Sequence, residues 1–118
     1  MRDGQATGFV GTGIAFDQLD AQTRAYLPRI VEVVRRALED ASCSVWLFGS
    51  RATGRATPVS DFDLAVRADG DISSELGFAR EELDESTIPF VVDLVDLREA
   101  SVALIEQVNR KGILLWKT

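Results

Sequence analysis

The apolar positions of the chain follow two spacings, and together these predict a protein of mixed helices and strands. Spacings of three and four residues, typical of amphipathic helices, occur over residues 16–39, 72–86 and 102–110. Short runs rich in apolar residues predict strands at residues 45–48, 61–66, 90–97 and 113–116. We therefore expect an α/β or α+β fold.

The stretch that joins the first two predicted strands carries the first candidate chemistry. It opens with Gly49-Ser50, and ten residues later Asp61-Phe62-Asp63 begins the second strand. Because side chains alternate along a strand, Asp61 and Asp63 point to the same face, with Cα atoms about 7 Å apart. At that distance two bare carboxylates repel each other by roughly 2 kcal/mol. Such a pair indicates a bound cation, most simply a hard divalent one.

A third carboxylate occurs in the strand predicted at residues 90–97. Asp93 is the one charged side chain on a face that otherwise carries Val91, Val95 and Leu97. An unpaired carboxylate in apolar surroundings costs free energy, so two explanations compete. Either Asp93 belongs to the same site as the two earlier aspartates, which we favour, or it pairs with an arginine.

Length, composition and charge limit the classes of protein to consider. A chain of 118 residues predicts a single domain, placed at residues 16–118 behind a flexible arm at residues 1–15. No apolar run is long enough to span a bilayer, no signal peptide is recognisable, and the only cysteine is Cys43; we therefore expect a cytoplasmic protein. The net charge of −6 argues against direct nucleic-acid binding. The absence of histidine excludes catalytic triads and zinc sites that need imidazole.

A Gly-Ser pair followed after ten residues by Asp-x-Asp, here Gly49-Ser50 with Asp61 and Asp63, is similar to the signature of the nucleotidyltransferase superfamily. The short chain and the third aspartate, Asp93, resemble its minimal (MNT) branch over nearly the whole sequence. That resemblance implies a small mixed or antiparallel sheet backed by helices. It also implies an antitoxin, paired with a helical HEPN toxin, that transfers AMP from ATP to a tyrosine hydroxyl of the toxin.

The chemistry of nucleotidyl transfer accounts for these residue types. An acceptor oxygen attacks the α-phosphorus of a triphosphate and pyrophosphate leaves. Negative charge therefore has to be neutralised both on the attacking side and on the leaving side of that phosphorus. Asp61, Asp63 and Asp93 are the expected catalytic residues and the expected ligands of two Mg²⁺ ions. Gly49 allows the backbone to approach the triphosphate, and Ser50 offers a hydroxyl and an amide to its oxygens.

Two more residues of the loop are included among the candidate nucleotide contacts. Arg51, like Arg55, either reaches the phosphates or is a solvated surface charge, and the sequence favours neither explanation. Ser60 is expected to steady the turn into the second strand, and it is also counted among the candidate nucleotide contacts.

The sequence therefore predicts a Mg²⁺-dependent nucleotidyltransferase that adenylylates a HEPN toxin and forms a hetero-oligomer with it. A rival hypothesis is a non-catalytic antitoxin that binds nucleotide as a structural ligand and neutralises the toxin by covering it. Transfer to a small molecule is a third alternative. We disfavour it because enzymes of that type that resemble this core carry an additional helical lobe to hold the acceptor.

Overall fold

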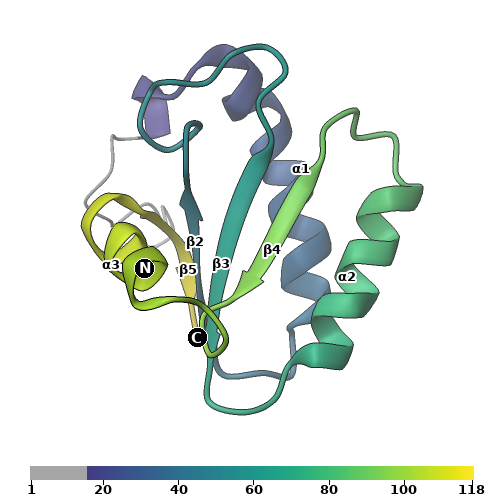
Figure 1. The fold of residues 1–118 in the computed structure, drawn as a ribbon. Helices are drawn as coiled ribbons and strands as arrows, with labels where there is room; N and C mark the ends of the chain where they lie inside the picture. Colours follow the sequence, from purple (N-terminus) through teal and green to yellow (C-terminus); the bar gives the residue numbers. More distant parts are fainter. Residues whose placement is uncertain (1–15) are drawn as a thin grey trace, which may run out of the picture.

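The computed structural model describes residues 16–118; the predicted arm at residues 1–15 lies outside that range, and the domain boundary stays a prediction. The order of helices and strands is the one that the apolar spacing predicts (Figure 1). In chain order the described elements are η1 (Phe16–Gln18), α1 (Ala21–Ala37), β2 (Cys43–Phe48), β3 (Phe62–Ala68), α2 (Ser73–Glu85), β4 (Val92–Asp96), α3 (Val102–Lys111) and β5 (Ile113–Lys117).

The ends of the helices follow from their capping residues. α1 begins later than predicted because Asp20 caps it: the Asp20 carboxylate accepts hydrogen bonds from the backbone N–H of Thr23 at 3.0 Å and from its hydroxyl at 2.6 Å. Residues 16–18 form a separate 3-10 turn. α3 begins where predicted, since the Ser101 hydroxyl accepts a bond from the Leu104 N–H at 3.2 Å.

The four strands form one mixed sheet in the order β4-β3-β2-β5. β2 runs antiparallel to both β3 and β5, whereas β3 and β4 are parallel. The register of the parallel pair sets Asp63 beside Asp93, with Leu64 beside Leu94 as the next pair. The sheet thus has the mixed form of the predicted fold class, and it brings two of the candidate acids together.

The two faces of the sheet are covered unequally (Figure 1). α1 and α2 pack on one face, where the larger hydrophobic core includes Ile30, Leu47, Leu64 and Leu76. α3 lies on the other face, where a small cluster is formed by Phe48, Ala65, Leu97 and Val108. Since side chains two apart share a face, Asp63 lies on the α3 side together with Ala65. Among the helices described, none has the length and apolar character needed to cross a membrane.

Candidate functional site

The predicted carboxylates meet on the side of the sheet that α3 covers only in part. Asp63 of β3 and Asp93 of β4 are register partners, and Asp61 directly precedes β3. Partial burial of Asp63, together with the negative charges of Asp93 and Asp61, raises the pKa of the Asp63 carboxyl above its ordinary value. The three carboxylates therefore repel one another, as the spacing of the first pair predicted.

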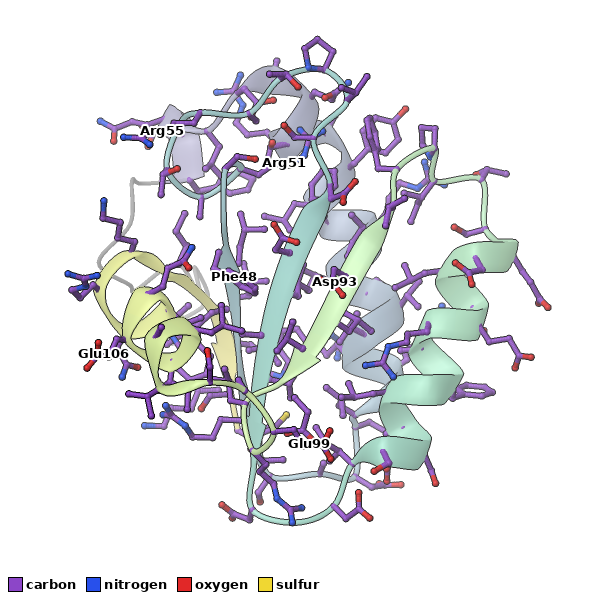
Figure 2. All side chains as sticks on the ribbon, in the orientation of Figure 1. Phe48, Arg51, Arg55, Asp93, Glu99 and Glu106 are labelled. Carbon is purple, nitrogen blue, oxygen red and sulfur yellow. The ribbon has the colours of Figure 1, made fainter. Side chains whose placement is uncertain are left out.

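Asp93 is exposed, which corrects the expectation that it occupies costly apolar surroundings. Its neighbour Val91 is 65% exposed, and the residues of this face that pack in the cluster beneath α3 are Val95 and Leu97, further along the chain. Figure 2 shows Asp93 on β4, to the side of α3. Among residues 16–118 no arginine or lysine forms an ion pair with Asp93, which weighs against the alternative of a structural pair.

The donors at this site fit a hard divalent cation, although they do not form a ready-made cage. Within residues 16–118, no three His, Cys, Asp or Glu side chains are already arranged to hold a metal ion. Mg²⁺, however, keeps several waters and is typically held by one or two carboxylates, which Asp63 and Asp93 offer from adjacent strands. A cation beside Asp63 would also offset the repulsion that raises its pKa.

Gly49 lies where the loop meets the acidic strand. Both its backbone conformation and the nearby Asp63 carboxylate require a residue without a side chain. Its φ is +79°, in the region that residues with a Cβ rarely adopt. A Cβ built at this position would overlap Oδ2 of Asp63. Beyond it the chain turns sharply: the Ala52 N–H donates to the Gly49 carbonyl at 3.1 Å, and the Arg55 N–H donates to the Ser50 carbonyl at 3.0 Å. The loop therefore lies directly against the acidic strand.

Substitution of Gly49 is expected to damage the site. In Gly49→Ala the methyl group has to displace the Asp63 carboxylate while the backbone holds a strained φ, so we expect a loss of about 2 kcal/mol in the free energy of unfolding and weaker nucleotide binding. Gly70→Ala is the matched control, because a Cβ at Gly70 meets nothing within 4 Å. Urea unfolding of both variants measures the effect; equal stabilities would show that Gly49 tolerates a side chain.

Arg51 does not face the candidate site, which corrects its assignment as a nucleotide contact. Its side chain is 1% exposed and lies inside the loop between β2 and β3 (Figure 2). Nε and one terminal nitrogen donate to the Ser60 carbonyl at 3.0 and 2.7 Å, and the other terminal nitrogen donates to Thr23 Oγ1 at 2.9 Å. The guanidinium also stacks on Phe62 and Phe90, 4.2 and 4.9 Å from the ring centroids.

The internal contacts of Arg51 explain how the loop is held. The residue follows Gly49-Ser50, and its main acceptor, Ser60, precedes Asp61, so one guanidinium fixes both ends of the loop. Burial lowers the pKa of Arg51, while the carboxylates of Asp20 and Asp61 act in the opposite direction. We therefore interpret Arg51 as a residue that shapes the loop around the site.

Ser60 steadies the turn, as the sequence suggested. Its hydroxyl accepts a hydrogen bond from the Thr57 N–H at 2.8 Å, and its carbonyl accepts from Arg51. Both of these contacts lie within the protein, so the structure supports its role in the turn, and its assignment as a nucleotide contact stays a prediction.

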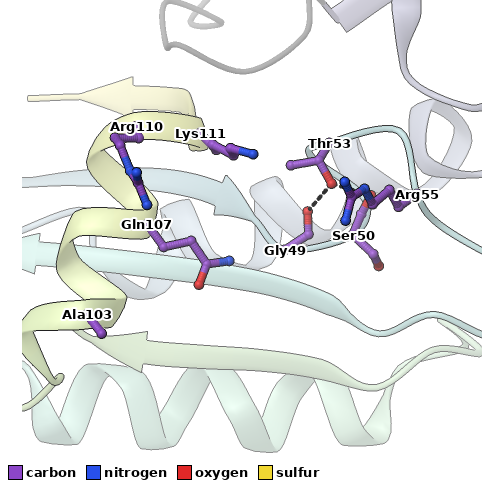
Figure 3. A pocket seen from close by; sticks show the side chains of 8 residues that line it. All are labelled: Gly49, Ser50, Thr53, Arg55, Ala103, Gln107, Arg110 and Lys111. Carbon is purple, nitrogen blue, oxygen red and sulfur yellow. Dashed lines mark hydrogen bonds between the residues drawn. The ribbon is translucent and has the colours of Figure 1, made fainter.

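A pocket of about 490 Å³ adjoins the Gly49-Ser50 loop, and part of its wall was missed from the sequence. Thr53 and Arg55 line it from the loop, and Gln107, Arg110 and Lys111 line it from α3 (Figure 3). Arg55 thus borders the candidate site, unlike Arg51. The amphipathic spacing of α3 predicted that one of its faces is polar. It could not predict which segment that face meets, because β3, α2 and β4 separate α3 from the loop in sequence.

The Gly-Ser loop seated against an aspartate of the next strand, with a second aspartate beside it, is the arrangement of a nucleotidyltransferase domain. The family model described as "Polymerase beta, Nucleotidyltransferase" matches residues 37–118, and the chain belongs to this family. It is similar to the protein adenylyltransferase MntA of Shewanella oneidensis, with 42% identity over 77 residues, covering 63% of this chain and 53% of that protein. It is also 32% identical over 107 residues to a probable protein adenylyltransferase MntA of Haemophilus influenzae, covering 86% of this chain and 87% of that protein.

Solved structures with a similar fold come from toxin–antitoxin complexes. A chain of a toxin–antitoxin crystal structure with AMP-PNP has a TM-score of 0.64 and 34% identity, covering 77% of this chain and 73% of that chain. A chain of the complex of tri-AMPylated Shewanella oneidensis HEPN toxin with MNT antitoxin has a TM-score of 0.59 and 31% identity, covering 81% of this chain and 73% of that chain. The predicted family and fold class are thereby confirmed.

Proposed function

We propose that this protein is an antitoxin that transfers AMP from ATP to a hydroxyl group of a cognate HEPN toxin, with Mg²⁺ as cofactor. The observation that carries the proposal is the pairing of Asp63 with Asp93, directly against Gly49. Similarity to two MntA adenylyltransferases and to the MNT antitoxin of an AMPylated toxin supports the reaction and the partner. The AMP-PNP complex of a similar chain supports an adenine nucleotide as donor.

The residues of the site have separate roles in this proposal. Gly49 and Ser50 bring backbone and hydroxyl groups to the phosphates, because Gly49 has no side chain to keep them away. Asp61, Asp63 and Asp93 hold Mg²⁺, which supplies neutralisation of charge on the reacting phosphate and on the leaving group. Asp93 is exposed at the outer strand, where it can accept the proton of an incoming hydroxyl.

The reaction is a displacement at phosphorus. The acceptor oxygen forms a bond to the α-phosphorus of ATP, the bond from that phosphorus to the β-bridging oxygen breaks, and pyrophosphate leaves. The hydroxyl proton passes to a carboxylate of the site or to water. Because Asp93 is exposed and β4 is an edge strand, a protein hydroxyl has access to this side of the site.

The proposal is tested by the mass of the toxin. When the protein is incubated with ATP, Mg²⁺ and its cognate HEPN toxin, we expect intact mass spectrometry to show additions of about 329 Da per AMP group on the toxin. The additions should persist after the two proteins are separated, and they should be absent when a chelator removes the metal or when Asp93→Asn replaces the wild-type protein.

A different result would favour the rival hypothesis. If the toxin is silenced without a change in mass, and Asp93→Asn silences it equally well, the protein neutralises its partner by covering it. In that case nucleotide bound at Gly49-Ser50 is a structural ligand.

A further inference from the structure

The pocket between the β2–β3 loop and α3 has a composition that contrasts with the rest of the chain. The protein carries a net charge of −6, yet the pocket is lined by Arg55, Arg110 and Lys111 and, among residues 16–118, by no carboxylate. Gln107 adds a neutral donor from the same helix. A concave, cationic surface of about 490 Å³ in an acidic protein indicates an anionic ligand.

The basic side chains approach the pocket from two separate segments. Arg55 comes from the loop and Lys111 from the last turn of α3 (Figure 3). Within the part of the chain that the structure describes, neither forms an ion pair with a carboxylate. A basic residue at the end of a helix is favoured by the helix dipole, but the dipole does not account for a second cation on the opposite wall. A bound anion between the loop and α3 would offset the electrostatic repulsion between Arg55 and Lys111.

The pocket also adjoins the acidic site in a definite order. Gly49 lines the pocket, and a Cβ built on the same residue would overlap Oδ2 of Asp63. A chain of phosphates that begins at the carboxylates and passes Gly49 therefore continues into the basic pocket. In the proposed reaction the α-phosphate lies at the carboxylates, so the phosphates beyond it are those that leave as pyrophosphate.

We propose that Arg55 and Lys111, together with Gln107, bind the β- and γ-phosphates of the nucleotide and the pyrophosphate that leaves. This inference rests on the proposed function, and it adds α3 to the nucleotide site. Charge-assisted hydrogen bonds from arginine and lysine to phosphate are among the stronger polar contacts in proteins. The helix thereby binds the leaving group, while the acids would hold the Mg²⁺ that neutralises charge on the reacting phosphate.

The test uses inorganic pyrophosphate with Mg²⁺ as the probe and the variants Arg55→Gln, Lys111→Gln and their combination. Isothermal titration calorimetry should show pyrophosphate binding that weakens about tenfold for each cation removed. In transfer assays the KM for ATP should rise while the KM for the protein acceptor stays unchanged. Both side chains are exposed, so the variants should keep the wild-type melting temperature.

Lys117→Gln is the matched control, since Lys117 is an exposed lysine at the other end of β5, beside Ser44. An unchanged pyrophosphate affinity in the double variant would overturn the inference. So would a loss of affinity in Lys117→Gln as large as that in Arg55→Gln or Lys111→Gln, because such a loss would reflect net charge alone. The two proposals fail separately. If the Arg55→Gln and Lys111→Gln variants transfer AMP with an unchanged KM for ATP, only the role of α3 is wrong. If the wild-type protein binds pyrophosphate selectively but transfers no AMP, only the proposed reaction is wrong.

Discussion

Replacing Asp61 and Asp63 together by asparagine is expected to abolish AMP transfer and to leave the fold intact. Neither amide carries the negative charge that a Mg²⁺ site needs, so we expect the rate of transfer to fall at least about a hundredfold. Toxin mass spectrometry over a time course measures the loss. Asp69→Asn removes a charge at the opposite end of β3 and should transfer AMP at the wild-type rate.

The same double variant should be more stable than the wild type at neutral pH. Partial burial and the neighbouring carboxylates raise the pKa of Asp63 in the folded protein, so the folded state binds this proton more tightly than the unfolded state does. The stabilising contribution of the proton is present at low pH and is lost as the pH rises through the folded-state pKa. Neutralisation should therefore raise the melting temperature at pH 7, and the gain should shrink at about pH 3.

Two outcomes would contradict the assignment of these acids. Full transfer activity in the double variant would exclude them as the metal site. A melting temperature that falls at pH 7 would show that the Asp63 carboxylate makes a stabilising contact in the free protein, in place of the repulsion described above.

The sequence predicted those parts of the structure that depend on local pattern. α3 begins after Ser101 because a serine cap is recognisable from its neighbours alone. The aspartates of the loop and of β3 were recognisable because their spacing from Gly49-Ser50 is fixed within one stretch of chain. Asp93 was placed on the correct strand by the valines around it, and the parallel register then set it beside Asp63.

The parts that were not predicted depend on contacts between distant segments. The destination of the Arg51 side chain is decided by Thr23, 28 residues away, and by the carbonyl of Ser60, so a loop arginine gives no local sign that it is buried. The exposure of Asp93 depends on how far α3 extends over the sheet. The pocket is formed by a loop and a helix that meet only in the folded chain, and periodicity identified the polar face of α3 without identifying what it faces.

Replacement of Arg51 by methionine is expected to be the most destabilising change in the loop. Methionine fills a similar volume but leaves the Ser60 carbonyl and the Thr23 hydroxyl without the donors that Arg51 supplies. Loss of these buried and partly buried bonds should lower the free energy of unfolding by about 3 kcal/mol, which corresponds to a fall of about 10 °C in melting temperature. Arg55→Met, at an exposed position of the same loop, should change stability by less than about 0.5 kcal/mol.

Arg51→Lys separates the shape of the side chain from its charge. Lysine keeps a cation near Asp61, but its single ammonium cannot reach Ser60 and Thr23 with the geometry of a guanidinium. If Arg51 fixes the two ends of the loop, Arg51→Lys should lose most of the stability that Arg51→Met loses. Its kcat for AMP transfer should also fall, because Asp61 is no longer held relative to Gly49. Wild-type kcat and melting temperature in Arg51→Lys would show that charge alone is needed at this position, and that the loop is held by its backbone turns.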